Sequence, residues 1–182
     1  MDAIALLKAD HRSVEKLFRE FEGAGDRAFA TKAKIASEIT RELCAQAEIE
    51  ELLFYPTALK AATATKSMVL ESLEEHLGLK RLLADLEKME STDERFDAKV
   101  TVLIEQVRHH VSEEEDDLFP KVVDGLDDER LKELDDDLDK AKAVVPTRPH
   151  PHASNAPPDN TVAGLASGVL DKGMDGIDRL TA

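Results

Sequence analysis

The feature that most constrains the fold of this chain is an internal repeat within its first 145 residues. Residues Ile49–Pro56 read IEELLFYP, and residues Glu113–Pro120 read EEEDDLFP. Equivalent positions such as Glu50 and Glu114 are 64 residues apart. A unit of this length accommodates one helical hairpin, and two such hairpins in succession predict a four-helix bundle with approximate two-fold symmetry.

Apolar residues recur at helical spacing through residue 145, and no strand-like alternation competes with that pattern. The expected helices span about residues 2–22, 28–55, 66–90, 94–119 and 127–145. Pro56 and Pro120 are expected to end the second and fourth of them, because proline lacks a backbone N–H and clashes with the preceding turn. The predicted fold class is therefore all-α, an up-down four-helix bundle with an additional C-terminal helix and a Pro-rich tail.

The chain beyond the bundle has a different composition. Five prolines lie between residues 146 and 158, and such a stretch cannot hold a helix. We therefore expect a bundle over residues 1–145, followed over residues 146–182 by a Pro/His-rich linker and a weakly helical tail. Apolar residues in 161–180 fall within about half a helical wheel, but the glycines among them weaken that helix. His150 and His152 are interpreted as solvated linker residues.

The charge of the chain excludes several classes of partner. Its 182 residues include 24 Lys and Arg against 39 Asp and Glu, for a formal net charge of −15. Nucleic acid and anionic membrane surfaces require clustered basic residues, so we expect neither as a partner. No apolar run is long enough to span a membrane and Met1–Ile4 lacks the basic start of a signal peptide, so we expect a cytoplasmic protein. The single cysteine, Cys44, excludes a thiolate cluster.

Polar side chains interrupt the apolar stripe of each expected bundle helix near its middle. They are His11, Gln46, Glu50, His76, His110 and Glu114. In an up-down bundle these positions lie at about one height, and burying an unpaired carboxylate there costs several kcal/mol or raises its pKa. A cation satisfies such a set, and nitrogen and carboxylate ligands without thiolate suit iron, manganese or zinc. Scattered hydrogen-bonded pairs without a metal are the alternative.

The ordered set of these residues resembles the hemerythrin-like proteins, specifically the HHE cation-binding domain. That family has a His on helix 1, His-x-x-x-Glu on helix 2, a His on helix 3 and His-x-x-x-Glu on helix 4, with an aromatic-proline ending after each pair. The resemblance covers residues 1–145. It implies a centre of two iron ions, with manganese or zinc as substitutes. It also implies that Glu50 and Glu114 bridge the metals, with His76 and His110 on one iron and His11 and residue 46 on the other.

The sequence departs from this family pattern at Gln46, where a His is expected. A glutamine carbonyl is a poorer, neutral donor, so the iron beside His11 loses a strong ligand. Three interpretations stay open: a weakened second iron, a site completed by Gln46 or water, or a deliberate replacement of the ligand. An open coordination position is compatible with function, since chemistry on a small molecule at a metal requires one.

Other polar residues near the site have less specific interpretations. Tyr55 is a candidate hydrogen-bond or proton donor, with packing at the end of the bundle as its alternative. Glu48, Glu51 and Glu115 are interpreted as a solvated face, with approach of Glu48 or Glu51 to the metal as the alternative if Gln46 does not bind it. His109 lies about 100° round the helix from His110 and should point away from the centre. Asp10 and Glu75 each precede a candidate ligand His. Either could support a ligand through a hydrogen bond, but neighbours on a helix face differently.

Three functions follow from this site. The first is a non-haem di-iron protein that binds or senses a small diatomic such as O₂ or NO, or takes part in iron and oxidative-stress handling. The second is an enzyme at the same centre, with catalase-like decomposition of hydrogen peroxide or reduction of NO. The third is a metal-depleted helical interaction protein whose centre has decayed with Gln46. The sequence specifies no protein partner.

Overall fold

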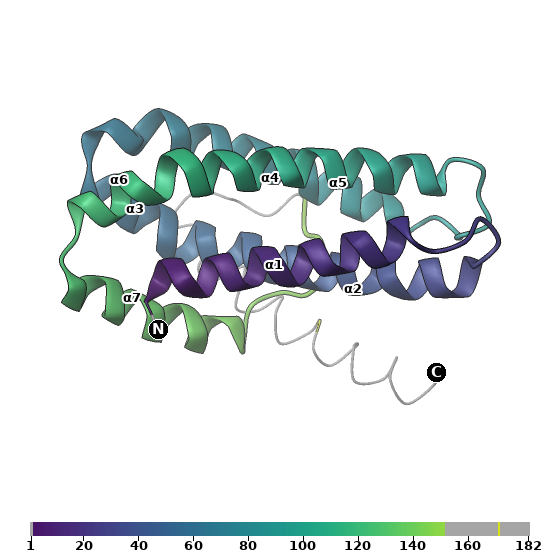
Figure 1. The fold of residues 1–182 in the computed structure, drawn as a ribbon, viewed down its shortest axis with the longest axis horizontal. Helices are drawn as coiled ribbons and strands as arrows, with labels where there is room; N and C mark the ends of the chain where they lie inside the picture. Colours follow the sequence, from purple (N-terminus) through teal and green to yellow (C-terminus); the bar gives the residue numbers. More distant parts are fainter. Residues whose placement is uncertain (1, 152–170, 172–182) are drawn as a thin grey trace.

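The structure, a computed structural model, describes residues 2–151 and residue 171. Within these residues the chain is helical and contains no strand. Four long helices run up and down side by side (Figure 1): α1 (Ala3–Glu22), α2 (Phe29–Ile49), α4 (Lys66–Leu86) and α5 (Phe96–Glu113). α1 packs on α2 and α4 packs on α5, as expected for two hairpins. The predicted all-α bundle is therefore confirmed.

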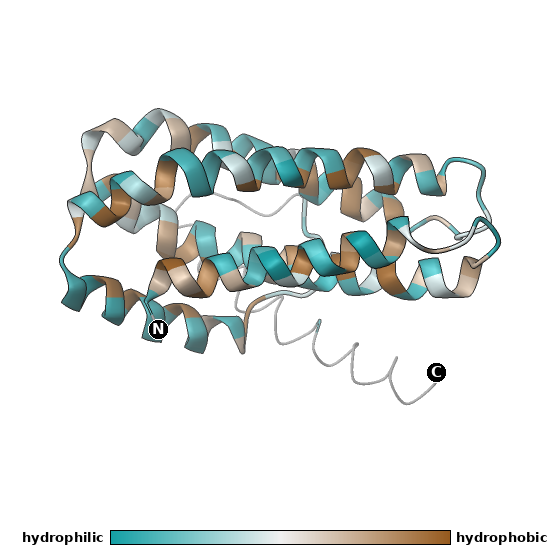
Figure 2. Cartoon of the chain, viewed as in Figure 1, coloured by the Kyte–Doolittle hydropathy of each residue, from teal (hydrophilic) through white to brown (hydrophobic). Residues whose placement is uncertain are grey.

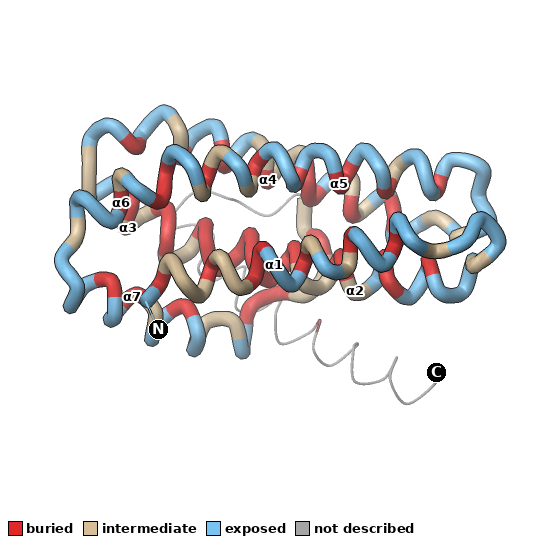
Figure 3. Tube along the Cα trace, viewed as in Figure 1, coloured by how far each residue is buried: buried red, intermediate tan, exposed pale blue. Residues whose placement is uncertain are grey.

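The core of the bundle consists of two apolar clusters along its length. Apolar and buried positions lie on the inward sides of the helices (Figures 2 and 3). One cluster contains Val14 and Phe18 of α1, and the other contains Leu7 of the same helix. His11 belongs to neither and lies between them in sequence. The polar residues that interrupt the stripes therefore form a layer between two apolar halves of the core.

The helices do not end at the two internal prolines, so the expected ends at residues 55 and 119 are wrong. Each helix widens into a π-helical turn, η1 (Glu50–Phe54) and η3 (Glu114–Leu118), and then continues as α3 (Tyr55–Ala61) and α6 (Phe119–Gly125). A proline inside a regular α-helix clashes with the carbonyl group four residues earlier. The wider turn accommodates the proline ring, and the chain stays helical through it. Both repeats use this device at the same place.

The short helices close one end of the bundle. α3 leads through the 3₁₀ turn η2 (Thr63–Thr65) into α4. α3 and α6 approach closely where Gly125 faces Ala61, since a Cβ on Gly125 would lie 2.5 Å from the Ala61 carbonyl oxygen. A glycine is therefore required at this contact.

The additional C-terminal helix is α7 (Asp128–Lys142), which packs against α1 and α2. The Asp127 side chain caps it by accepting a hydrogen bond from the Arg130 backbone N–H. Leu131, Leu134 and Leu138 are buried on its inner face. The helix expected over residues 161–180 lies outside the described residues, except for Asp171, and the division at residue 146 stays a prediction. Among the described helices, none is both long and apolar enough to cross a membrane.

Candidate metal centre

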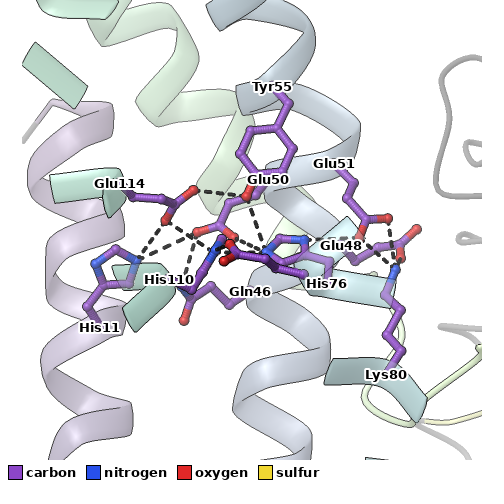
Figure 4. A network of polar contacts seen from close by, with 11 residues as sticks. His11, Gln46, Glu48, Glu50, Glu51, Tyr55, His76, Lys80, His110 and Glu114 are labelled. Atoms are coloured by element: carbon purple, nitrogen blue, oxygen red, sulfur yellow. Dashed lines mark hydrogen bonds and ion pairs between the residues drawn. The ribbon is translucent and has the colours of Figure 1, made fainter. Parts of the chain in front are cut away.

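The fold brings the six polar residues of the predicted centre to one place between the helices (Figure 4). Each is at most 6% exposed. In chain order they are His11 of α1, Gln46 of α2, Glu50 of η1, His76 of α4, His110 of α5 and Glu114 of η3. The two glutamates are the first residues of the two π-helical turns, so the repeat in the sequence is a repeat in the site.

Glu50, His76 and His110 form the first group of candidate ligands. Their ligand atoms lie within 4.8 Å of one another. The Nε2 atoms of His76 and His110 are 3.1 Å apart, and Glu50 Oε2 is 3.4 Å from His76 Nε2. Two imidazole nitrogens and a carboxylate oxygen therefore face the same point.

His11, Glu50 and Glu114 form the second group, also within 4.8 Å. His11 Nε2 lies 3.4 Å from Glu114 Oε2 and 3.8 Å from Glu50 Oε1. Gln46 donates a hydrogen bond of 3.0 Å from its amide Nε2 to Glu50 Oε1. Glu50 is thus common to both groups, with one oxygen toward each, and Gln46 contacts that shared carboxylate.

A cation fits these residues, because several of their buried atoms have no hydrogen-bond partner. These atoms are His11 Nε2, Gln46 Oε1, Glu50 Oε2 and Glu114 Oε2. A buried polar atom without a partner is costly, and most buried polar groups in proteins have one. Three of the four are the nitrogen and carboxylate atoms that the two groups direct inward. Coordination of a cation would satisfy them together.

The closely spaced charges shift the pKa values of the centre. Burial lowers the pKa of His11, but Glu114 and Glu50 outweigh it and raise that pKa to about 10. Burial also lowers the pKa of His110, but the carboxylates of Glu114 and Glu75 outweigh it and raise that pKa to about 9. Burial and the nearby His110 hold the pKa of His76 well below its usual value. Because a histidine ligand binds a metal only through a deprotonated nitrogen, a cation here would replace protons on the imidazoles.

Each histidine of the centre has a second carboxylate on its outer nitrogen. His11 Nδ1 lies 2.7 Å from Glu115 and His110 Nδ1 lies 2.7 Å from Glu75. His76 Nδ1 lies 3.0 Å from Glu51. An Nδ1–H that donates to a carboxylate leaves the Nε2 lone pair free to face inward, which is the tautomer that a metal requires.

Sequence reasoning missed Glu51 and Glu115 as outer carboxylates, and it named Glu75 without the histidine that Glu75 contacts. Glu51 and Glu48 are buried rather than solvated, and Glu51 is 0% exposed. Glu115 contacts His11, although 30% of its side chain is exposed. Glu75 does face away from its neighbour His76, as expected, but it reaches across to the next helix.

A buried lysine compensates the carboxylates beside His76. Lys80 Nζ lies 2.9 Å and 2.8 Å from the two oxygens of Glu51, and 3.7 Å from Glu48. Burial raises the pKa of Glu51, and Lys80 opposes that shift. Lys80 comes one helical turn after His76 on α4, so α4 supplies both the histidine and the cation that holds its partner in place.

Tyr55 lies in the centre and not merely at the packed end of the bundle. Its hydroxyl donates a hydrogen bond of 2.9 Å to Glu114 Oε1 and lies 3.2 Å from His76 Nε2. Burial and the carboxylates of Glu114 and Glu50 raise the pKa of Tyr55 well above 10. The phenol therefore keeps its proton and directs it into the centre.

Two clefts reach the centre on either side of α5. One, of about 390 Å³, lies between α4 and α5, and its lining includes His76 and His110. The other, of about 350 Å³, lies between α1 and α5, and its lining includes His11 and Gln46. Each group of candidate ligands therefore has its own approach from the surface.

A helical bundle that directs buried His and Glu side chains at one point defines a class of cation-binding proteins. The family described as Hemerythrin HHE cation binding domain matches residues 2–122, and the chain belongs to this family. Membership implies that the domain binds metal cations.

Individual relatives agree with this assignment. An uncharacterised hemerythrin-like protein of Schizosaccharomyces pombe is 29% identical over 171 residues, which cover 93% of this chain and 83% of that protein. A DNA nickase of Nostoc sp. is 26% identical over 143 residues, which cover 79% of this chain but 40% of the nickase. A crystal structure of a hemerythrin HHE cation binding domain-containing protein from Mycobacterium kansasii matches with a TM-score of 0.66 and 24% identity, covering 78% of this chain and 85% of that one. This last likeness supports the fold.

Proposed function

We propose that this protein is a non-haem di-iron protein whose paired metal ions bind or sense a small molecule such as O₂ or NO. The observation that carries the proposal is the position of Glu50. Its Oε1 lies 3.8 Å from His11 Nε2 and its Oε2 lies 3.4 Å from His76 Nε2. A carboxylate shared by two ligand groups is the arrangement that a two-metal site in a helical bundle uses.

The residues divide between the two ions as follows. His76, His110 and Glu50 would hold one iron, and His11, Glu50 and Glu114 would hold the other, with Gln46 beside Glu50. When bound, an iron pair supplies redox-active, Lewis-acidic positions that take up a small molecule.

The side chains around the candidate ligands control which molecules reach the two metal positions. Phe18 and Val107 line the α1–α5 cleft, and Leu79 and Val107 line the α4–α5 cleft. These apolar walls limit the entry of water and protons. Tyr55 keeps one proton directed at Glu114.

Metal analysis of full-length protein purified under iron-replete conditions tests the proposal. We expect two iron ions per chain and a visible spectrum that changes on addition of O₂ or NO. Titration of the metal-free protein with Mn²⁺ or Zn²⁺ should reach the same stoichiometry, because both ions accept the same ligand types.

A variant of the shared carboxylate separates a specific centre from adventitious binding. Glu50→Ala should bind less than one ion per chain, whereas Glu105→Ala, at an exposed position of α5, should bind as many as the parent. A parent protein without metal would instead favour a helical interaction protein.

The position of Tyr55 favours a second candidate function, the decomposition of hydrogen peroxide. Two peroxide molecules give two water molecules and one O₂, so the reaction needs no other reductant, but protons must move between oxygens. The Tyr55 hydroxyl, 2.9 Å from Glu114 and 3.2 Å from His76, is a buried proton holder at the centre. We expect O₂ release from peroxide by the iron-loaded parent to fall at least tenfold in Tyr55→Phe, an effect typical of general acid–base catalysis. Equal turnover in both proteins would exclude a role for this hydroxyl.

A further inference from the structure

A third group of metal-ligand side chains lies outside the centre, on the outer side of α4 and α5. It consists of Glu75, His109 and Glu113, whose ligand atoms lie within 4.8 Å of one another. His109 Nε2 is 3.3 Å from Glu113, one helical turn later on α5, and the His109 side chain is 66% exposed. Glu75 completes the group from α4, so two helices contribute an imidazole and two carboxylates, the ligand types that divalent transition metals accept.

This group lies at the mouth of the cleft between α4 and α5. Glu75 and His109 line that cleft near the surface, and the buried His76 and His110 line it further in. Glu75 connects the two levels, because its Oε2 is 2.7 Å from Nδ1 of His110. A cation held by the surface group would therefore be one side chain away from a candidate ligand of the centre.

The charges of the two clefts differ. The lining of the α4–α5 cleft contains Glu71, Glu74 and Glu75 and neither lysine nor arginine. The lining of the α1–α5 cleft contains Arg12 and Arg108 as well as carboxylates. Carboxylates gathered at the mouth of a cleft concentrate cations there and raise their association rate. The α4–α5 cleft is therefore the approach suited to a cation.

We propose that Glu75, His109 and Glu113 form a docking site for a divalent transition-metal cation, from which the cation passes through the α4–α5 cleft into the centre. The inference rests on the proposed metal-binding function and adds the route by which the metal enters. A buried centre can be filled only by a cation that loses its water shell. Three protein ligands at the mouth replace part of that shell before the cation meets His110.

The rate at which metal-free, full-length protein takes up Co²⁺ tests this proposal. Co²⁺ gives a visible absorbance once nitrogen and oxygen ligands enclose it, so rapid mixing at low ionic strength reports both the rate and the extent of uptake. The test variant is His109→Ala combined with Glu113→Gln, which leaves Glu75 and the ligands of the centre in place. The matched control is Glu105→Gln, which removes the same formal charge from an exposed position of α5.

We expect the double variant to take up Co²⁺ about tenfold more slowly than the control, in line with the effect of electrostatic focusing on association rates. With no more Co²⁺ than the centre binds, its final absorbance should equal that of the parent. Added salt should slow Co²⁺ uptake by the parent more than uptake by the double variant, because screening weakens the attraction between the carboxylates at the cleft mouth and the cation. After the centre is filled, equilibrium dialysis should detect one further, weaker Co²⁺ in the parent that the double variant lacks.

Four results would overturn the proposal. Uptake by the double variant at the rate of the control would exclude a docking role, as would the lack of the further Co²⁺ in the filled parent. A lower final absorbance in the double variant would assign these residues to the centre itself. If the parent takes up no Co²⁺ at all, both the metal centre and its loading route are rejected. If every variant takes up Co²⁺ as the parent does, only the loading route is rejected.

Discussion

The two halves of the candidate metal centre follow one plan and differ in a few side chains. In each half a π-helical turn is followed by an aromatic ring that packs against a histidine. Tyr55 packs against His76 with ring centroids 5.4 Å apart, and Phe119 stacks on His11 at 5.8 Å and an interplanar angle of 11°. Only the first of these two rings carries a hydroxyl group. The repeat therefore preserves the packing of the two halves and changes their chemistry.

The outer carboxylates of His76 and His11 also differ, because one is more deeply buried than the other. The outer carboxylate of His76 is the fully buried Glu51, which is held by the buried Lys80. The outer carboxylate of His11 is Glu115, whose side chain is 30% exposed. Coulomb interactions are stronger where water is excluded, so the carboxylate partner of His76 is held more strongly than that of His11. The comparison teaches that a duplicated frame can support its two equivalent histidines to different degrees.

The largest effect is expected from Lys80→Met, which leaves the Glu51 carboxylate buried without its cation. We expect the free energy of unfolding of the metal-free protein to fall by about 3–5 kcal/mol, measured by urea denaturation. The double variant Lys80→Met/Glu51→Gln removes the unpaired charge and should recover most of this loss. A double variant as unstable as the single one would show that Lys80 acts through its packing and not through its charge.

The next effect concerns metal content. His110→Ala removes a ligand from the better-supplied half and should cost about one of the two ions, whereas Gln46→Ala should cost little. Gln46→His should raise iron retention in the His11 half, because imidazole is a stronger donor than an amide. Iron titration of the metal-free forms measures the stoichiometries, and dialysis of the loaded forms against a chelator measures retention. If Gln46→His retains iron no better than the parent and Gln46→Ala no worse, position 46 is not a ligand position.

A smaller effect is expected from Tyr55→Phe, which makes the aromatic rings of the two halves alike. The change removes the hydrogen bond to Glu114, a buried carboxylate that then lacks this partner. We expect a loss of about 1–2 kcal/mol in the free energy of unfolding of the metal-free protein. Unchanged stability would mean that another group satisfies Glu114 in the variant.

The smallest effect is expected at the surface of the His11 half, where Arg108 on α5 binds Glu15 and Glu22 on α1. Hydrogen bonds from Arg108 lower the pKa of both carboxyl groups below the usual 4.5. Carboxyl groups with a lowered pKa add stability above their usual pKa and lose it as the pH falls through the lowered value. Arg108→Ala should therefore cost less than about 1 kcal/mol at neutral pH, since these side chains are partly exposed and screened.

Thermal melting at neutral pH and at about pH 3 checks this prediction. The difference between Arg108→Ala and the parent should shrink in acid and in high salt. The control is Lys16→Ala, which removes the more exposed ion pair with Glu20. Its melting temperature should equal that of the parent. A difference that stays constant with pH would contradict an electrostatic origin.

The bundle and the inner layer of the site were predictable from the sequence because both depend on periodicity. The 64-residue repeat and the polar positions in four apolar stripes are enough to place His11 and Glu50 near the same point. Their burial and convergence in the structure agree with that prediction. Their role as metal ligands stays a proposal.

The outer layer was not predictable, because it depends on contacts between helices. Glu51 is about 100° round the helix from Glu50, and this spacing alone predicts a solvated side chain. In a bundle, however, the flank of one helix packs against its neighbour, and there Glu51 meets Lys80. Glu75 likewise finds His110 on the next helix and not a partner on its own. Local spacing carries no information on such pairs.

The π-helical turns also shift the helical phase of the chain. In an unbroken α-helix, Tyr55 would lie about 140° round the axis from Glu50. Through the turn, the Tyr55 backbone N–H bonds to the Glu50 carbonyl, and Phe119 bonds to Glu114 in the same way. One helix can thus bring a carboxylate and an aromatic ring to the same side, five residues apart. The number of residues between them is consequently as constrained as their identity, because one insertion or deletion would rotate every side chain that follows.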